Sequence, residues 1–380
     1  MTLANQRHLF ELPDDVAYLR CAATAPLMRS AREAGELALA QKARPWGPAW
    51  NDAGEAVERV RELFAELIGA TGNDIALAPS ASYGLSIAAH NTRIGDGREV
   101  IVLADQFPSN VYPWREAVRR DGGSIRTIER PHGGDWSDAV AAGIGSRTAV
   151  VAVPHCHWLD GTLLNLPLIG NRCRAVGAAL VLDLSQSAGA LPFDLAAIDP
   201  DYAISVAEKW LLGPVQLAFL YVSPRHQTGM PIEHSWVGRE DSGDARFLHH
   251  YADSYRGGSR RFDVGERSNI VNLAIAIAAL TQIREWGVAE ISSALRHTTD
   301  SIAERVLDLG CELAHPKQRV PHFLGLRRRG GWPADLQTRF ETQKVLVNLR
   351  GDSLRVAPYL FTNKRDIDAF VHCLRETMER

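Results

Sequence analysis

Short, almost uninterrupted apolar runs constrain the fold of this chain more than any other feature of its sequence. Each run has the length of a strand and is rich in β-branched or aliphatic residues. Such runs are typical of strands that are buried on both faces of a mostly parallel sheet. They are Glu99–Leu103, Ala149–Val153, Ala179–Asp183, Tyr202–Val206 and Leu217–Val222. Helical stretches separate several of these runs, so the sequence predicts an α/β architecture.

The helical stretches fall into two groups. Ala53–Ala70 carries apolar residues at helical spacing ahead of the strands, and Asn110–Arg120 and Gly170–Gly177 lie between them. After about residue 270 the pattern changes, because a long helix over Ser268–Trp286 leads directly to another over Val288–Leu309. Shorter strand and helix signals then continue to the C-terminus.

The length of 380 residues is large for a single compact core. We therefore predict a large α/β domain over residues 26–270 and a smaller α+β domain over residues 271–380. Residues 1–25 are predicted to pack against the smaller domain.

Composition and charge exclude several classes of function. A net charge of −3 gives no general reason to expect contact with nucleic acid or an anionic membrane. The N-terminus lacks the apolar core of a secretory signal, and no apolar run approaches the roughly 20 residues that a membrane span needs. The five cysteines are scattered and form no CxxC pair. Reduced thiols in a cytoplasmic protein are therefore expected, rather than disulfides or a metal site.

A lysine follows one predicted strand at the place where α/β proteins bind ligands. Ligands of open α/β sheets bind beyond the carboxyl ends of the strands, and Lys209 comes shortly after Tyr202–Val206. Partial desolvation there would lower the pKa of the amine and favour imine formation. An exposed loop lysine is the alternative, and taken alone it is the simpler interpretation.

Two further polar features lie at predicted strand ends. Asp183 closes a buried aliphatic strand and needs a partner, which a protonated ring nitrogen of a cofactor, a helix N-terminus or a buried cation could each supply. In the segment Ala78–Ala89, small residues and hydroxyls precede an apolar helical pattern. A helix N-terminus at Ser80–Ser82 would bind phosphate well, although a plain serine cap is the alternative.

Taken together and in this order, these segments resemble the class V aminotransferase family of fold type I pyridoxal-phosphate (PLP) enzymes. That family includes cysteine desulfurases, kynureninase, isopenicillin N epimerase and several transaminases. Val16–Pro26 is similar to the family's N-terminal "YLDNAAT" stretch, and Ser353–Asn363 is similar to its "lRvSphlyNt". The resemblance implies the fold type I architecture, in which a mostly parallel seven-stranded sheet lies between helices and a smaller α+β C-terminal domain follows.

The resemblance also implies roles for individual residues around the cofactor ring. Lys209 matches the Schiff-base lysine, Asp183 the partner of the pyridine nitrogen, and Gln186 the side chain near the phenolate oxygen. Phe107 matches the aromatic residue that stacks on the ring. Arg355 matches the arginine that binds the substrate α-carboxylate, a task that suits a planar guanidinium.

Other positions are implied to bind the phosphate or the substrate. The phosphate is expected at Ser80, Ala81 and Ser82. The segment Gly265–Asn269, which includes Ser268, is expected to reach the phosphate of a neighbouring subunit, and this implies a homodimer with shared active sites. Ala23 and His157 are expected near the substrate, and either Trp158 or His157 is expected near the phenolate oxygen.

The chain also departs from the family pattern. Glu208 stands where desulfurases often carry His, Val206 where they carry Ser, Glu266 where Thr is common, and Trp158 where Asn is common. Persulfide-forming desulfurases carry a reactive Cys shortly before the carboxylate arginine, whereas residues 312–354 contain no Cys. A persulfide mechanism is therefore not expected.

We accordingly expect a PLP enzyme that acts at the α-carbon of an amino acid, as an aminotransferase or a C–S (β-) lyase. Epimerase or racemase activity, or a kynureninase-like hydrolysis, is the alternative. A PLP-binding module without turnover is a further hypothesis, motivated by the departures from the family pattern. A nicotinamide-dependent dehydrogenase is disfavoured, because no GxGxxG follows an early strand. The identity of the substrate side chain is not readable from the sequence.

Overall fold

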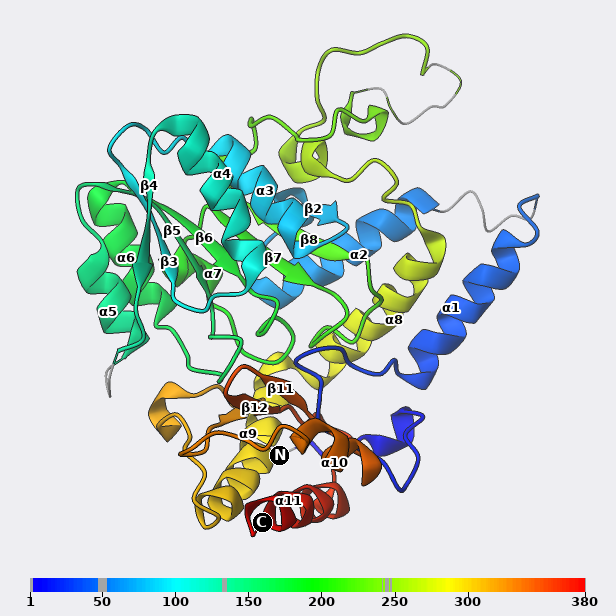
Figure 1. Cartoon of the computed structure of the whole chain (residues 1–380). Helices are drawn as coiled ribbons and strands as arrows, with labels where there is room; N and C mark the ends of the chain where they lie inside the picture. Colours follow the sequence, from blue (N-terminus) through cyan, green and yellow to red (C-terminus); the bar gives the residue numbers. More distant parts are fainter. Residues whose placement is uncertain are drawn as a thin grey trace.

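The chain forms a large α/β part and a smaller part beside it (Figure 1). The computed structural model describes residues 3–46, 53–131, 135–240, 242, 246 and 248–379. The predicted N-terminal segment begins with residues 1 and 2, and the predicted smaller domain ends with residue 380. These three residues lie outside the described residues. In the described part of the chain, no helix is both long and apolar enough to cross a membrane.

A seven-stranded sheet forms the centre of the large part, in the order β2-β8-β7-β6-β5-β3-β4. Only β8 runs antiparallel to its neighbours, and the other neighbouring strands pair in parallel. The bounds are β2 (Ile75–Ala78), β3 (Glu99–Leu103), β4 (Ser124–Ile128), β5 (Thr148–Pro154), β6 (Ala179–Asp183), β7 (Tyr202–Val206) and β8 (Ala218–Val222). The predicted mostly parallel sheet is therefore confirmed.

The strand predictions succeed for the longer apolar runs and miss one short apolar strand and one polar strand. β3, β6 and β7 begin and end as predicted, while β5 gains one residue at each end and β8 starts one residue later. The sequence did not predict β2, which has only four residues, or β4. β4 is an edge strand with exposed positions, so polar residues such as Arg126 interrupt its apolar pattern.

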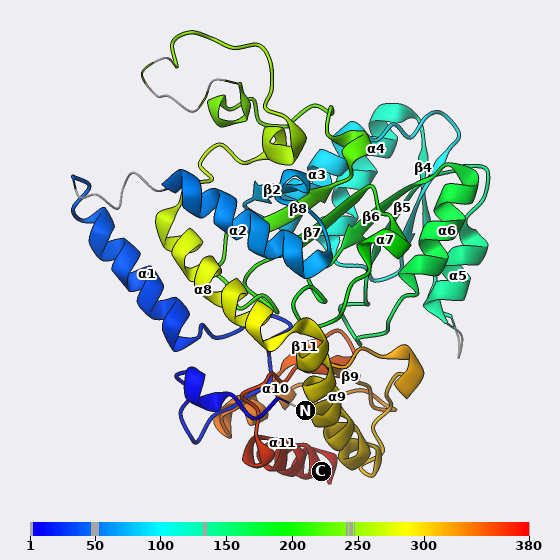
Figure 2. The ribbon, with the colours of Figure 1, turned by 180° about the vertical axis from the view of Figure 1, so that it is seen from behind.

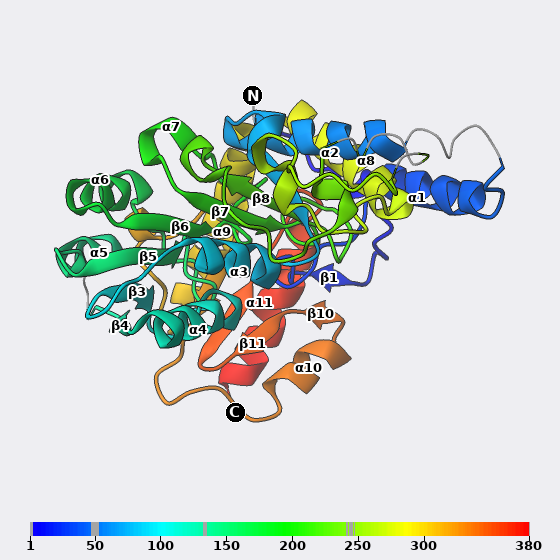
Figure 3. The same cartoon turned by 90° about the horizontal axis from the view of Figure 1, so that it is seen from above.

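Helices cover both faces of the sheet because successive strand residues point to opposite sides. In β3, Val100 and Val102 join one buried cluster with α3 and α4, while Ile101 and Leu103 join another with α2, α5 and α6. Figure 3 shows α3 and α4 on one side of the sheet and α2, α6 and α7 on the other. These helices are α2 (Ala53–Ile68), α3 (Ala81–Asn91), α4 (Tyr112–Asp121), α5 (Trp136–Gly143), α6 (Leu166–Val176) and α7 (Leu195–Ile198).

The smaller part is built on a three-stranded antiparallel sheet in the order β11-β12-β9. Its strands are β9 (Leu324–Leu326), β11 (Asn348–Arg350) and β12 (Ser353–Val356), and its helices are α9 (Val288–Leu307), α10 (Leu336–Thr342) and α11 (Lys364–Met378). The long helix α8 (Ile270–Trp286) joins the two parts and packs beside α1 (Arg29–Lys42), as Figure 2 shows from behind. Single turns of 3-10 helix occur at Arg7–Leu9, Gly72–Asp74, Pro108–Asn110, Pro224–His226, Trp236–Gly238, Gly258–Phe262 and Pro316–Gln318.

The N-terminal segment bonds to both parts of the molecule. β1 (Ala17–Tyr18) pairs in parallel with β10 (Val345–Leu346) of the smaller part. The amide of Cys21 donates to the carbonyl of Ala357 at 3.2 Å. A few residues later, the amide of Ala25 donates to the carbonyl of Glu208 in the large part at 2.9 Å. The proposed domain limits near residues 25 and 270 stay predictions.

Candidate active site

A cavity of about 380 Å³ lies at the carboxyl ends of the central parallel strands. Pro154, Asp183 and Val206, which are the last residues of β5, β6 and β7, line it together. The N-terminus of α3, the segment after β1 and the β11–β12 hairpin complete the wall. The sheet therefore presents its ligand-binding edge to a space that the smaller part closes.

Most of the residues that the sequence singled out line this cavity. They are Ala23, Ser80, Ala81, Ser82, Phe107, Trp158, Asp183, Gln186, Lys209 and Arg355. Two do not line it. His157 is fully buried elsewhere, and Ser268 is exposed just before Asn269, the N-cap of α8, so it lies outside the cavity of its own chain.

Lys209 is a half-buried cavity lysine rather than an exposed loop residue. Burial lowers the pKa of its amine, while the nearby carboxylates of Asp183 and Glu208 oppose that shift. Nζ lies 5.4 Å from the centroid of the Phe107 ring and has no hydrogen-bond partner among the described residues. A lysine with a lowered pKa has more of the neutral amine that imine formation requires.

The carboxylate of Asp183 is buried at the end of β6 and only partly satisfied. Oδ1 accepts a hydrogen bond of 2.9 Å from the amide of Ser185, and Oδ2 accepts none from the described residues. The hydroxyl of Ser185 is also buried without a partner. A buried acid with an open oxygen fits a protonated ring nitrogen, so this part of the donor set suits PLP.

The side chain of Gln186 is fixed by two hydrogen bonds. Its Nε2 donates to the carbonyl of Ala22 at 2.8 Å, and its Oε1 accepts from the indole of Trp210 at 3.0 Å. An amide nitrogen carries two N–H groups, and Ala22 takes one. The second remains free to donate to an oxygen on a bound ring.

The two side chains considered for the phenolate oxygen use their N–H groups elsewhere. The indole of Trp158 donates to the carbonyl of Asp105 at 2.6 Å, and Nε2 of His157 lies 3.1 Å from the carbonyl of Ala104. The His157 ring stacks on Trp136 with centroids 5.5 Å apart. Trp158 instead turns its ring edge-to-face toward Phe107, at 5.3 Å. Of these three side chains, Gln186 keeps an N–H group without a partner in the described structure.

The N-terminus of α3 offers donors for a phosphate. Ser80 is the N-cap, and its Oγ accepts from the amide of Tyr83 at 3.2 Å. The hydroxyls of Ser80 and Ser82 lie 3.0 Å apart at the cavity wall. Free amides and hydroxyls at the start of a helix bind anions well. Val206, which stands where desulfurases carry Ser, adds an apolar side chain to the wall in place of a hydroxyl.

Arg355 is a buried cation without an acidic partner among the described residues. Its Nη1 donates to the carbonyl of Trp158 at 3.0 Å, and its Nε has no partner. Desolvation lowers the pKa of the guanidinium to about 10, and the neighbouring charge of Arg350 adds to the effect. A buried, uncompensated guanidinium suits a substrate carboxylate.

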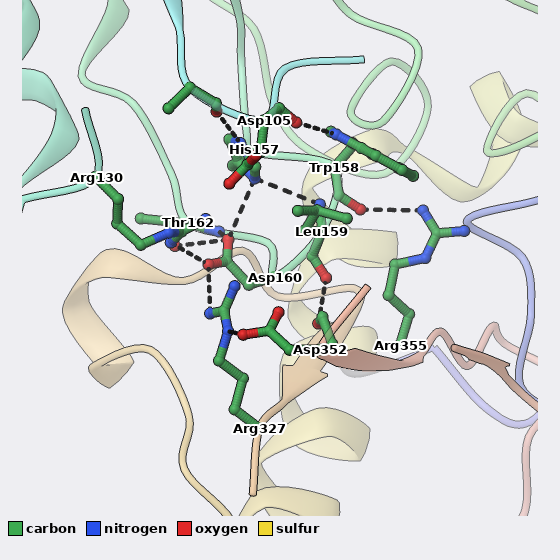
Figure 4. Close-up of polar contacts among 12 residues, drawn as sticks. Asp105, Arg130, His157, Trp158, Leu159, Asp160, Thr162, Arg327, Asp352 and Arg355 are labelled. Carbon is green, nitrogen blue, oxygen red and sulfur yellow. Dashed lines mark hydrogen bonds and ion pairs between the residues drawn. The ribbon is translucent and has the colours of Figure 1, made fainter. Parts of the chain in front are cut away.

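The segment that carries Trp158 is bonded to both parts of the molecule (Figure 4). Ser353 donates its hydroxyl to the carbonyl of Leu159 at 2.7 Å. Asp160 accepts from Arg130 at 2.5 Å and from Arg327 at 3.2 Å. Burial alone would raise the pKa of Asp160, but His157 and Arg130 hold it below its usual range. These contacts fix the carbonyl that orients Arg355.

Several cavity residues had no role in the sequence-based predictions. Cys156 lies next to Asp183, but burial raises the pKa of its thiol and keeps it protonated. Glu208 lines the cavity, and burial raises the pKa of its carboxyl group. Arg350 lies on the wall five positions before Arg355, and this spacing alone does not indicate that the two side chains share a face. All five cysteines are buried.

Comparison with known proteins identifies close structural likeness over almost the whole chain. The model of the family described as aminotransferase class-V matches residues 17–368. A mutant of the cystine C–S lyase C-DES, solved with glycine covalently linked to its PLP cofactor, superimposes with a TM-score of 0.88 at 20% identity. The superposition covers 98% of this chain and 99% of that one. The predicted fold type I architecture is thereby confirmed.

Two sequence relatives carry different descriptions. The Bacillus subtilis protein YcbU, described as an uncharacterized aminotransferase, is 27% identical over 84% of each chain. The kynureninase of Pseudomonas fluorescens is 30% identical over 59% of this chain and 55% of its own length. The predicted likeness to aminotransferases and kynureninases is therefore present in the sequence.

Proposed function

The chain belongs to the class V aminotransferase family, and we propose that it is a PLP-dependent enzyme acting at the α-carbon of an amino acid. Aminotransferase or C–S (β-) lyase chemistry is the proposed reaction. The observation that carries the proposal is one cavity that holds a lysine with a lowered pKa, a buried open carboxylate and a buried unpaired guanidinium: Lys209, Asp183 and Arg355.

Each of these residues has a distinct task in the proposed reaction. Lys209 would hold the cofactor covalently and, once released, move a proton at the α-carbon. Asp183 would keep the ring nitrogen protonated, and Phe107 would stack on one face of the ring. When bound, the cofactor supplies a ring that absorbs the electrons left at the α-carbon.

Substrate recognition is assigned to the side of the cavity formed by the smaller part. Arg355 would bind the α-carboxylate with two parallel hydrogen bonds, because one edge of its guanidinium, including Nε, has no hydrogen-bond partner in the described structure. Trp158 and the chain around it would exclude water from this pair, since Trp158 lies between Arg355 and Phe107. Water exclusion strengthens the attraction between the two charges.

We propose lyase or aminotransferase chemistry because the family includes both, and the cysteines argue against a persulfide on the protein. A persulfide route needs a reactive thiol, and the thiol nearest to the proposed reaction is Cys156, whose pKa is raised by burial. A kynureninase-like hydrolysis stays the alternative, and two kynureninase-like features support it, the Phe107–Pro108 pair and the 30% identity.

We also propose that the protein is a cytoplasmic homodimer. The exposed segment around Ser268 would reach the cofactor phosphate in the active site of the partner subunit.

A panel of amino acids incubated with the PLP-loaded protein tests the proposal. Keto acid formed only with an amino acceptor would identify an aminotransferase. Pyruvate formed without an acceptor, together with sulfide from cysteine or cysteine persulfide from cystine, would identify a lyase. Alanine released from kynurenine would favour the hydrolase instead. Absence of turnover with every amino acid, in a protein that binds PLP, would leave the binding module as the better description.

A further inference from the structure

Two arginines point to the same side of the β11–β12 hairpin. Arg350 pairs with Ser353 and Asn348 pairs with Arg355 in the antiparallel register. Directly opposed residues share a face of the sheet, and so do residues two positions away. Arg350 and Arg355 are therefore diagonal neighbours on one face, and both line the cavity.

Neither of these two guanidinium groups has an acidic partner among the described residues, although arginines close by are paired. Arg130 and Arg327 both bond to Asp160, and Arg327 bonds to Asp352 as well. In the described structure, Arg350 donates a hydrogen bond from Nη1 to the carbonyl of the adjacent Leu349 at 3.2 Å. Two like charges on one face repel each other, and an anion between them would relieve that repulsion.

The rest of the cavity cannot neutralise this pair once the cofactor is in place. Asp183 lies at the strand edge, where it would pair with the ring nitrogen. Glu208 is the other acid of the cavity wall, and burial raises the pKa of its carboxyl. A single substrate carboxylate at Arg355 leaves the charge of Arg350 uncompensated.

Building on the proposed function, we propose that Arg350 binds a second anionic group, so that the substrate is a dicarboxylic amino acid. The α-carboxylate would bind Arg355 in the buried interior of the wall. The side-chain carboxylate would bind Arg350, which is exposed at the cavity and can follow side chains of different length. Arg350 is thus the residue that selects the substrate side chain.

Two amino acids that carry a methyl group in place of the α-hydrogen test this assignment. 2-Methylaspartate and 2-methylalanine can bind the PLP-loaded protein without losing an α-proton, and binding is followed by the change in visible absorbance. The wild-type protein is expected to bind the dicarboxylate roughly 10- to 100-fold more tightly, as hydrogen bonds to charged groups allow. In Arg350→Gln the ratio of the two affinities should fall to near one. In Arg350→Lys the ratio should lie between the value of this variant and that of the wild type.

Arg329→Gln is the matched control, since Arg329 is an exposed arginine of the smaller part that does not line the cavity. It should keep the wild-type ratio. Equal affinity of the wild-type protein for the two ligands, or an equal loss of both in Arg350→Gln, would overturn the assignment and leave the proposed function standing. A protein that never binds PLP would overturn both.

Discussion

Arg355 donates a hydrogen bond of 3.0 Å to the main-chain carbonyl of Trp158, and its Nε points to no partner in the described structure. A side chain of the smaller part is thus held by a loop of the large part. The hydrogen bond fixes one edge of the guanidinium and leaves the other for a ligand. Because the contact crosses between the two parts, their packing would decide where a substrate carboxylate binds in the proposed reaction.

Replacing Lys209 should remove the covalent attachment of the cofactor. Wild-type protein with PLP is expected to be yellow, with absorbance near about 420 nm from the protonated imine. Lys209→Ala should lose this band and lose activity by roughly 10³-fold or more, because the base at the α-carbon is also gone. Lys209→Arg should fail as well, since a guanidinium stays protonated. Exposed Lys317→Ala is the control. If borohydride reduction still attached PLP covalently to the Lys209→Ala protein, the assignment would be refuted.

The lowered pKa of Lys209 predicts how PLP attachment to the apoprotein depends on pH. Burial favours the neutral amine, so the pH of half-maximal attachment should lie below the ordinary 10.5 of lysine. Glu208 opposes this shift, because its negative charge stabilises the ammonium form. Glu208→Gln should therefore move the profile further toward acid, as measured by absorbance after mixing with PLP at a series of pH values. A shift toward alkali would contradict the charge assignment.

Removing the guanidinium of Arg355 should weaken binding of the amino acid by its carboxylate. Arg355→Gln is expected to lower kcat/KM for amino acids by roughly 10- to 100-fold, the usual value of a hydrogen bond to a charged group. The corresponding amines, which lack the carboxylate, give the comparison. The preference for amino acid over amine should collapse in the variant. An unchanged preference would mean that the carboxylate binds elsewhere.

Asp160 should stabilise the fold at neutral pH and lose that effect in acid. Its folded pKa is lowered, so its contribution is complete above the ordinary pKa of 3.8 and is lost as the pH falls through the lower folded value. Asp160→Asn leaves Arg130 without its acid and removes one of the two acids that Arg327 contacts, so it should cost about 3 kcal/mol of the free energy of unfolding at pH 7. Urea unfolding at pH 7 and at pH 3 measures both effects. The difference between variant and wild type should shrink at the lower pH.

The same variant should also affect substrate binding through Arg355. Asp160 fixes the segment whose Trp158 carbonyl orients that guanidinium. KM for an amino acid should therefore rise more than kcat falls, with the visible spectrum of bound PLP unchanged. A loss confined to kcat would argue against this positioning role.

The sequence predicted the parts of the fold that an apolar pattern encodes. β3, β6 and β7 are buried on both faces, so the sequence predicted where they begin and end. The edge strand β4 is polar, and the sequence did not predict it. The cavity residues at strand ends were predicted for the same reason: a strand that is easy to recognise shows where its carboxyl end lies. Lys209 and Asp183 are two such residues.

The loop contacts could not be predicted in this way. Trp158 and His157 were both candidates for a cofactor contact, and only the folded path of the chain shows that carbonyls of residues 104 and 105 occupy their N–H groups. The closeness of Arg350 to Arg355 depends on the register of a hairpin with a two-residue turn, which Gly351 enables with its φ of +57°. Sequence spacing alone does not specify that register.

The path of the N-terminal segment has a consequence for the order in which the molecule can assemble during synthesis. Its amides bond to Ala357 and to Glu208, and Ala22 supplies both a cavity wall and the acceptor for Gln186. The N-terminal segment leaves the ribosome before the C-terminal strands, and it must wait for them before these contacts can form. The large α/β part can form its sheet during translation, but its ligand-binding edge stays open until the C-terminal strands arrive. A chain that ended before these strands would contain Lys209 without the side of the cavity that Arg350 and Arg355 form.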